Sequence, residues 1–382
     1  MQILCLSHDF PPDFGGIAVV LNNLCTQLCY LGHRVDVLAP KQERCTAADA
    51  RQPYRVYRYE SPQRFSSITP IYRTLTLYRQ HSYDVIFIGH FMSTHALGVL
   101  LLRRLWGVPY VILSHGNDLR YSLHTKVDRW VARLLLNNAT KMLGCSRFVV
   151  GLIRHAGYKG PAEILNPPVD LTKFHPGVDT NEIIQRFNLE ERRVLITAAR
   201  LVAKKNIDGV LLALPRVIEK VPDLLYLVVG DGEERQKLEK LTDELGLRHY
   251  VRFLGYIENS KLAALYCASN IFVMPSYEVE DTVDIETFGV SFIEANACGK
   301  PVIGGRAGGT KDAVVDGETG LLVDPHNIDE IAAAIIRLLT NRELAQQLGE
   351  HGRRRVERDL TMERVGHRLE HFLLTAISRT RV

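Results

Sequence analysis

The sequence predicts an α/β protein of two Rossmann-like domains whose parallel sheets face a central cleft. Apolar stretches of strand length alternate with helical stretches over the 382 residues, a pattern typical of parallel sheets covered by helices on both faces. Glycine-containing loops follow apolar stretches, as at 15–16 and 230–232, which is where open α/β sheets bind ligands. A proline-containing segment at 163–176 predicts a hinge between two halves of ordinary domain size.

The first predicted domain spans residues 1–168. Its order is a buried strand, a loop, a helix and a second strand, which together outline a nucleotide-binding unit. The loop lacks the G-x-G-x-x-G spacing, so we do not expect a dinucleotide site. The strands are expected at 2–7, 34–40, 54–59, 83–90, 109–116 and 141–146, with helices at 17–31, 97–105, 126–137 and 147–157.

The second predicted domain spans residues 169–361 and repeats the same alternation. Its strands are expected at 193–200, 226–232, 251–255, 271–276 and 301–305, with helical stretches between them. A final helix at about 362–382 is expected to pack back on the first domain.

The net charge of +4 conceals an asymmetry between the two halves. Residues 1–180 carry 20 Lys and Arg against 12 Asp and Glu, a balance of +8, and the remainder has a balance of −4. A basic first half favours an anionic partner on that side. Arg103 and Arg104 are adjacent, and Lys126, Arg129 and Arg133 share one face of a predicted helix. They predict a basic surface that meets an anionic membrane, and a merely solvated basic face is the alternative.

Composition excludes several classes of protein. The seven cysteines form no C-x-x-C pair, which argues against a zinc site and favours reduced thiols in a cytoplasmic protein. The first residues do not resemble a signal peptide, and no apolar run reaches the length of a membrane span. We expect a cytoplasmic protein, peripheral at the inner face of the cell membrane.

The stretch from Glu286 to Glu294 is the strongest candidate for chemistry. It follows an apolar strand-like run and leads into a helical run, so Glu286 should lie in a loop and Glu294 within the next helix. The amides of Gly289 and Val290 would then be free at a helix start, which is a natural site for an anion. The alternative is a solvated helix next to an ordinary loop glutamate.

Arg200 and Lys205 flank the first loop of the second domain, at the same sheet edge. A guanidinium and an ammonium can neutralise a leaving diphosphate without a metal. The chain has no D-x-D motif, and we expect neither a metal nor a cofactor.

Two features of the first domain lie at predicted strand ends. Gly15 and Gly16 at a helix start fit close approach of the backbone to a phosphate or sugar, although a tight turn without a ligand is the alternative. His115 ends a buried strand, a position that favours function over a purely structural role.

These motifs occur together and in order, and they resemble the retaining glycosyltransferases of family 4, which have the GT-B fold. The resemblance covers nearly the whole second domain, and in the first domain only Gly15-Gly16 and His115-Gly116. The segments that carry it are RLVAKKN (200–206), VVGDGEERQKLEK (228–240) and ETFGVSFIEANACGKPVIGGRAGGTKDAVVDGETGLLVDP (286–325), with the E-x7-E spacing of Glu286 and Glu294.

The resemblance implies a role for each matching residue. Arg200 and Lys205 would contact the donor diphosphate, Glu294 the ribose and Glu286 the donor sugar. His115 would contact the reacting sugar. The implied donor-binding residues also include Gly15, Gly16, Gly230, Phe288, Gly289 and Val290.

The segment before Glu286 is longer than the family pattern, so Glu278 competes for the first-glutamate role, although only Glu286 keeps the x7 spacing. The resemblance implies transfer of a hexose from a nucleotide sugar to a sugar or lipid-linked acceptor in polysaccharide or glycolipid assembly. UDP-hexose is our first choice of donor, and a GDP-mannose-dependent mannosyltransferase is the alternative. A nucleotide-sugar epimerase and a non-catalytic sugar-nucleotide sensor are the remaining alternatives. No nucleic-acid partner is expected.

Overall fold

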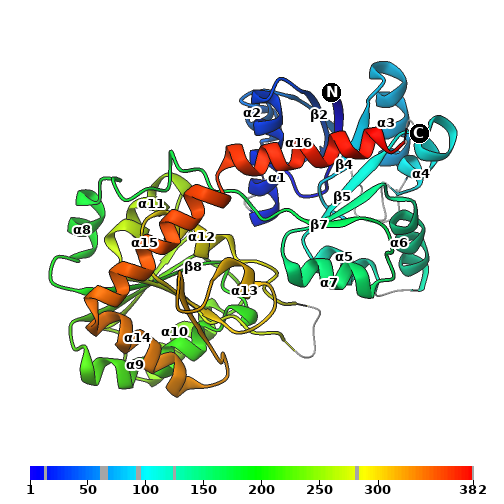
Figure 1. The fold of residues 1–382 in the computed structure, drawn as a ribbon. Coiled ribbons are helices and arrows are strands. Elements are labelled where there is room, and N and C mark those ends of the chain that lie inside the picture. Colours follow the sequence, from blue (N-terminus) through cyan, green and yellow to red (C-terminus); the bar gives the residue numbers. More distant parts are fainter. Residues whose placement is uncertain (13–14, 61–67, 92–95, 124–125, 280–283, 381–382) are drawn as a thin grey trace. The chain divides into compact units, whose positions relative to one another are not determined.

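The computed structural model describes residues 1–12, 15–60, 68–91, 96–123, 126–279 and 284–380. The chain forms two compact units (Figure 1). Unit 1 comprises Met1–Pro168 and Met362–Val382, and unit 2 comprises Val169–Thr361. The division falls inside the proline-containing segment 163–176.

Unit 1 contains a seven-stranded sheet in the order β3-β2-β1-β4-β5-β6-β7, and every neighbouring pair is parallel. Its central strands are buried on both faces, which explains their continuous apolar sequences. The strands are β1 (Gln2–Leu6), β2 (Arg34–Pro40), β3 (Arg55–Tyr59), β4 (Val85–Ile88), β5 (Tyr110–Ser114), β6 (Lys141–Gly144) and β7 (Ala162–Ile164).

The connecting helices of unit 1 pack on this sheet and on one another. Helix α4 contacts both α3 and α6, so the three form a continuous layer. The helices are α1 (Gly16–Tyr30), α2 (Cys45–Asp49), α3 (Ile68–His81), α4 (Ala96–Trp106), α5 (Asn117–Ser122), α6 (Lys126–Asn138) and α7 (Arg147–His155).

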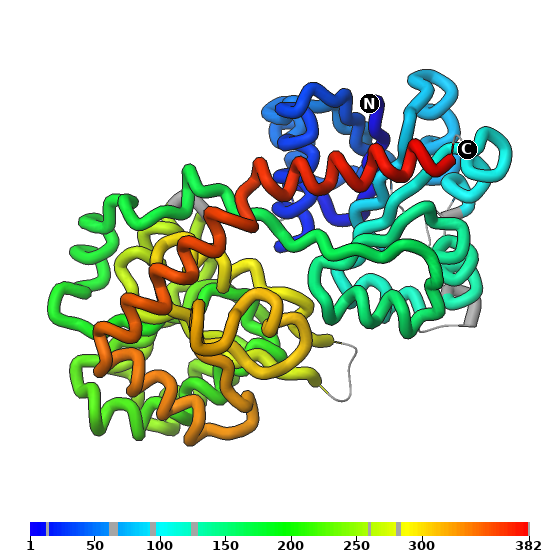
Figure 2. The backbone as a smooth tube through the Cα atoms, in the orientation of Figure 1, coloured from blue at the N-terminus to red at the C-terminus, as the bar shows by residue number. Residues whose placement is uncertain are grey.

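Helix α16 (Met362–Ser378) belongs to unit 1 although unit 2 precedes it in the chain. It packs against α1, β4 and β5, as the red segment beside the blue one in Figure 2 shows. A Cβ on Gly366 would lie 2.1 Å from Cγ of Gln27, so a larger residue there would displace the Gln27 side chain of α1. His33 and Glu370 add a hydrogen bond of 2.7 Å between the two segments.

Unit 2 contains a six-stranded parallel sheet in the order β10-β9-β8-β11-β12-β13. Its strands are β8 (Arg193–Ala198), β9 (Leu224–Val229), β10 (Val251–Gly255), β11 (Ile271–Met274), β12 (Val302–Gly305) and β13 (Gly320–Val323). Helix α9 packs against α14, and α12 packs against α15. The helices are α8 (Asn181–Phe187), α9 (Ile207–Lys220), α10 (Arg235–Glu244), α11 (Asn259–Ala268), α12 (Val290–Ala297), α13 (Thr310–Ala313), α14 (Ile328–Thr340) and α15 (Arg342–Asp359).

Both sheets are parallel and follow the predicted strand–helix alternation, which confirms the predicted fold class. In the part of the chain that the structure describes, no helix is long and apolar enough to cross a membrane. The seven cysteines are free thiols.

Candidate active site

Lys205 and Glu286 form an ion pair in unit 2. Nζ of Lys205 donates a hydrogen bond to Oε2 of Glu286, and these side chains are only 15% and 12% exposed. Lys205 ends a 3₁₀ turn after β8, and Glu286 lies in the loop after β11. Because β8 and β11 are neighbours in the sheet, their carboxyl ends bring the two loops together.

The environment of Glu286 keeps its carboxyl group ionised. Burial alone would raise the pKa of this carboxyl, but the charges of Lys205 and Lys204 oppose it. Hydrogen bonds from Lys205 and from the Phe288 N–H act in the same direction, and the pKa lies below its ordinary value. Glu286 is therefore a carboxylate that can accept hydrogen bonds from hydroxyl groups.

Two further contacts hold the Glu286 loop. Lys204 is buried and forms an ion pair with Asp284 at 2.6 Å. The N–H of Gly309 donates to the carbonyl of Glu286 at 2.8 Å, and a Cβ at Gly309 would lie 1.8 Å from the carbonyl oxygen of Thr287. The glycine-rich segment after β12 therefore supports this loop through a backbone approach that a side chain would prevent.

Glu294 lies within α12, as the helical run predicted. Oε2 of its partly buried carboxyl group accepts a hydrogen bond of 3.2 Å from the hydroxyl of the buried Tyr266. Burial raises the pKa of Glu294 to about 7, and the hydrogen bond from Tyr266 opposes this rise only in part. The carboxyl group thus changes its protonation near neutral pH.

Helix α12 begins at Val290, with Gly289 as its N-cap residue. The φ of Gly289 is +93°, and a Cβ there would lie 2.5 Å from the ring of Phe292. Glycine is therefore required at this cap. The first amides of an α-helix have no acceptor within it, so α12 directs N–H groups and its positive dipole end toward the loop of Glu286. Phe288, between them, is buried.

Arg200 follows β8 and is exposed. Within the described ranges, no hydrogen bond or ion pair joins its guanidinium to another residue, so this cation is available to an anionic ligand. Gly230 follows the adjacent strand β9, and a Cβ there would lie 1.9 Å from the carbonyl oxygen of Ala199. Gly230 therefore permits close packing beside Arg200, and its predicted ligand contact stays a prediction.

In unit 1, His115 is buried directly after β5. Burial lowers its pKa, and the nearby charge of Asp118 only partly opposes this effect. Nε2 of His115 lies 3.0 Å from the carbonyl oxygen of Gly89, which fits a neutral ring with its hydrogen on Nε2. The carboxylate of Asp118 accepts hydrogen bonds from the backbone N–H groups of His115 and Phe91, at 3.1 and 2.9 Å.

Gly15 is the N-cap residue of α1, and Gly16 begins that helix. A Cβ at either position would meet no atom within 4 Å, so packing among the described residues does not require glycine there. Both residues are exposed. Their predicted contact with donor phosphates stays a prediction.

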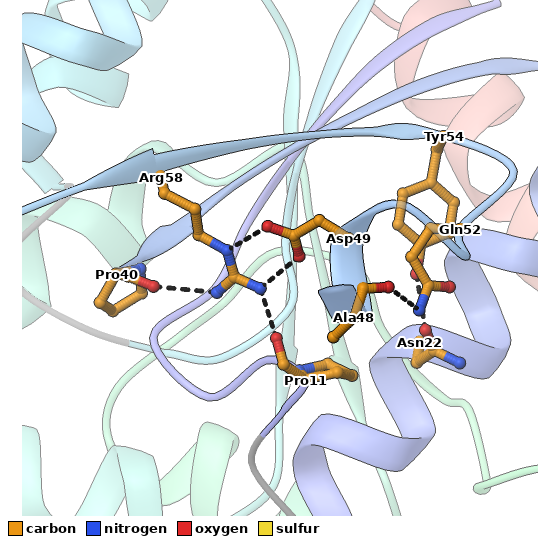
Figure 3. Close-up of polar contacts among 8 residues, drawn as sticks. All are labelled: Pro11, Asn22, Pro40, Ala48, Asp49, Gln52, Tyr54 and Arg58. Atoms are coloured by element: carbon orange, nitrogen blue, oxygen red, sulfur yellow. Dashed lines mark hydrogen bonds and ion pairs between the residues drawn. The ribbon is translucent and has the colours of Figure 1, made fainter. Parts of the chain in front are cut away.

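Arg58 of β3 anchors the loop that precedes these glycines, as Figure 3 shows. Its guanidinium donates to Oδ2 and Oδ1 of Asp49 at 3.0 and 2.7 Å and to the carbonyl of Pro40 at 2.9 Å. It also donates to the carbonyl of Pro11. The side chain of Arg58 is 9% exposed, so a largely buried cation ties the loop after β1 to β2 and α2.

The residues predicted for the acceptor side lie on α4 and α6. Arg104, Arg129 and Arg133 are exposed, whereas Arg103 is partly buried and donates to the carbonyl of Gly107 at 3.1 Å. The side chain of Lys126 lies outside the described residues.

Trp130 lies on α6 beside these arginines. Its side chain is 63% exposed, next to the exposed Arg129. A bulky aromatic side chain this exposed is unusual, since such side chains normally face the core.

Sequence reasoning missed several residues that organise these sites. The sequence could have indicated Asp118, because it is a polar residue just beyond a buried strand. No local sequence pattern indicates Tyr266 or Arg58, since their contacts with Glu294 and Asp49 depend on packing between separate elements.

Two family descriptions match this chain. "Glycosyltransferase Family 4" matches residues 14–173, and "Glycosyl transferases group 1" matches residues 179–355. The chain is 32% identical to the GDP-mannose-dependent alpha-(1-6)-phosphatidylinositol monomannoside mannosyltransferase of Mycolicibacterium smegmatis, with 92% of each chain covered. It is 31% identical to the protein of that name from Mycobacterium tuberculosis, with 97% of this chain and 98% of the relative covered.

Solved structures of low sequence identity share the fold. The Anabaena protein HepE in complex with UDP superposes with a TM-score of 0.83 at 20% identity, covering 98% of this chain and 100% of HepE. Sucrose-phosphate synthase from Thermosynechococcus elongatus gives a TM-score of 0.80 at 23% identity, with 99% of both chains covered. From these matches and the two parallel α/β units, the chain belongs to the family 4 glycosyltransferases and has the GT-B fold.

Proposed function

We propose that this protein is a retaining, metal-independent mannosyltransferase that moves mannose from GDP-mannose to a membrane lipid with a hydroxylated head group. The observation that carries the choice of donor is the 31–32% identity, over more than 90% of the chain, to relatives named as GDP-mannose-dependent mannosyltransferases. UDP-hexose, our first choice from the sequence, is not the donor that the names of these relatives print.

The groups in unit 2 suit the departure of a diphosphate. The bond from the sugar C1 to the diphosphate oxygen breaks, and a bond from C1 to the acceptor oxygen forms on the same face. The leaving oxygen takes the acceptor proton, while Arg200 and Lys205 stabilise the developing negative charge. Glu286, ionised and paired with Lys205, accepts hydrogen bonds from donor sugar hydroxyls.

The nucleotide part of the donor is assigned to α12 and its neighbourhood. Glu294 accepts hydrogen bonds from the ribose hydroxyls, and the amides of Gly289 and Val290 bind phosphate at the helix N-terminus. In unit 1, Gly16 contacts the donor phosphates, and neutral His115 contacts the reacting sugar.

Donor preference is tested by ligand-dependent stability and by transfer. GDP and GDP-mannose should raise the melting temperature by several degrees at saturation, and UDP-glucose should not. Mannose should then pass to phosphatidylinositol monomannoside in detergent micelles. Stabilisation by UDP-glucose alone, or transfer of glucose from it, would overturn the choice of donor.

Metal independence is tested on the same reaction. Excess EDTA should leave the initial rate unchanged, because Arg200 and Lys205 supply the positive charge. Loss of activity in EDTA, with recovery on adding Mg²⁺ or Mn²⁺, would overturn this assignment.

Unit 1 presents an apolar stripe suited to a lipid surface. Leu97, Leu101 and Leu105 recur every four residues along α4 and are 48%, 42% and 64% exposed. Such spacing places them on one face of the helix. Trp106 and the Trp130 of the neighbouring α6 are also exposed, and amphipathic aromatic rings favour membrane interfaces.

Three exposed cations lie near this stripe, and the two helices that carry them contain one acidic residue, Asp128 of α6. Arg104 lies on α4, and Arg129 and Arg133 lie on the adjacent α6. Helices α3 and α4 contain no acidic residue. Each cation near an anionic membrane contributes about 1 kcal/mol, and the attraction fades with salt. We therefore assign the membrane-facing surface to α4 and α6, at the cytoplasmic side of the cell membrane.

Vesicle co-sedimentation tests this surface. Wild type should bind vesicles that contain phosphatidylinositol or phosphatidylglycerol, and less so as salt increases. Leu101→Ser with Leu105→Ser, and Arg129→Glu with Arg133→Glu, should each weaken binding about tenfold or more. The matched controls are Leu212→Ser and Lys220→Glu on α9, which are exposed positions of unit 2. Equal binding by all variants would favour a soluble acceptor.

A further inference from the structure

Three adjacent strands of unit 1 bring an acid and two imidazoles to one edge of the sheet. Asp9 follows β1, His90 follows β4 and His115 follows β5, and these strands are neighbours in the order β1-β4-β5. The rings of His90 and His115 have their centroids 6.4 Å apart. Asp9 interacts electrostatically with both imidazoles.

The backbone around the two histidines is fixed by Asp118. Its carboxylate accepts hydrogen bonds from the N–H of Phe91, next to His90, and from the N–H of His115. The ring of His115 is itself bonded to the carbonyl of Gly89. The positions of both loops are thus set by the protein alone.

His90 differs from His115 in its hydrogen bonding. Its Nδ1 is buried and has no hydrogen-bond partner among the residues that the structure describes. A buried polar atom without a partner costs about 1–3 kcal/mol, and most such atoms in proteins are bonded. This nitrogen is therefore suited to a hydrogen bond with a bound molecule.

Asp9 supplies the complementary charge. Its side chain is 39% exposed. A hydrogen bond with His8 holds the pKa of Asp9 below its ordinary value, with smaller contributions from His90 and His115. An ionised carboxylate accepts hydrogen bonds from hydroxyl groups and repels phosphate. The group beside it should therefore be a neutral polyol, rather than a diphosphate.

We propose that Asp9 and His90 bind the hydroxylated ring of the acceptor, a sugar or a cyclitol, and orient its attacking hydroxyl. Asp9 accepts hydrogen bonds from ring hydroxyls, and Nδ1 of His90 completes the contact. This proposal rests on the proposed glycosyl transfer and adds residues that bind the acceptor rather than the donor.

The test compares transfer to acceptor with hydrolysis of the donor in the absence of acceptor. Asp9→Asn and His90→Phe should raise the KM for phosphatidylinositol monomannoside in micelles about tenfold or more. The KM for GDP-mannose and the rate of donor hydrolysis should stay within about twofold of wild type. His90→Asn, which can keep a hydrogen-bonding atom near the position of Nδ1, should recover most of the acceptor affinity.

The matched control is His155→Phe, an exposed histidine at the end of α7, which should change neither KM. Melting temperatures of all variants exclude unfolding, and His90→Gln replaces His90→Phe if that variant does not fold. An unchanged acceptor KM in both the His90 and Asp9 variants would overturn the proposal, as would an equal loss of donor hydrolysis. If wild type turns over a different nucleotide sugar, the proposed donor fails, and the acceptor measurements are made with that sugar.

Discussion

The hydroxyl of Tyr266 donates a hydrogen bond to Oε2 of Glu294 at 3.2 Å, joining α11 to the middle of α12. Tyr266 is buried and the carboxyl group of Glu294 is partly buried, and this burial governs how the protein should respond to pH. Two predictions follow from the resulting pKa of Glu294, which is raised from 4.5 to about 7.

The first concerns stability. Between about pH 4.5 and 7 the folded protein keeps a proton on Glu294 that the unfolded chain releases, so stability falls as pH rises through this window. Glu294→Gln keeps an acceptor for Tyr266 and has no proton to lose. It should exceed wild type at pH 8 by on the order of 2–3 kcal/mol in urea unfolding, and match it at pH 4.5. The exposed Glu219→Gln on α9 is the control and should show no such pH-dependent difference.

The second concerns nucleotide binding. A carboxylate accepts hydrogen bonds from both ribose hydroxyls, whereas a carboxylic acid accepts them less well. Affinity for GDP should therefore increase between pH 6 and pH 8, by up to about tenfold per unit below the pKa. Calorimetry at the two pH values measures the affinity for GDP, and Glu294→Gln should bind GDP weakly at both. A pH dependence that persists in the variant would have its origin elsewhere.

Lys205→Met removes the ammonium that faces Glu286 and, in the proposed reaction, the leaving diphosphate. Turnover should fall by about 10²–10³, comparable to the loss of one donor to a developing oxyanion. Steady-state kinetics measures the effect, and Lys220→Met on the exposed face of α9 controls for loss of charge. Wild-type turnover in Lys205→Met would rule out this role.

The two candidate first glutamates make different predictions. Glu286 is buried against Lys205, whereas Glu278 is exposed. Glu286→Gln should lower turnover at least tenfold and leave GDP affinity within about threefold, since its proposed contact is with the donor sugar and not with the nucleotide. Glu278→Gln should leave both unchanged. The opposite pattern would transfer the first-glutamate role to Glu278.

Arg58 and Asp49 form a largely buried pair that holds the loop before Gly15 (Figure 3). Removing one charge leaves the other buried, at a cost of about 3–5 kcal/mol. Asp49→Asn should therefore unfold at a clearly lower urea concentration than wild type. The exposed pair of Arg248 and Asp243 is the comparison, and Asp243→Asn should have no measurable effect. If the two variants lose equal stability, burial is not the reason that the pair of Arg58 and Asp49 stabilises the protein.

The alternation of apolar and amphipathic stretches was enough to predict the fold, because strands buried on both faces have an unmistakable composition. The same argument placed Glu286 in a loop and Glu294 in a helix. It could not predict the partners of these residues, since Lys205 and Glu286 are 81 positions apart and meet only through sheet order. Helix periodicity also could not predict that Trp130 is exposed, because it identifies a stripe of side chains but not what covers that stripe. The donor base has no local signal either: the sequence favoured UDP-hexose with GDP-mannose as the alternative, and the proposed choice of GDP-mannose rests on the names of relatives.

The return of α16 to unit 1 affects the order in which the protein can be assembled during synthesis. Residues 1–168 leave the ribosome before α16 exists, so the face of β4 and β5 that this helix covers stays uncovered while unit 2 is made. All segments of unit 2, by contrast, are contiguous from Val169 to Thr361. Unit 2 can therefore complete its core without waiting for later residues, whereas unit 1 completes its core only when α16 packs against α1.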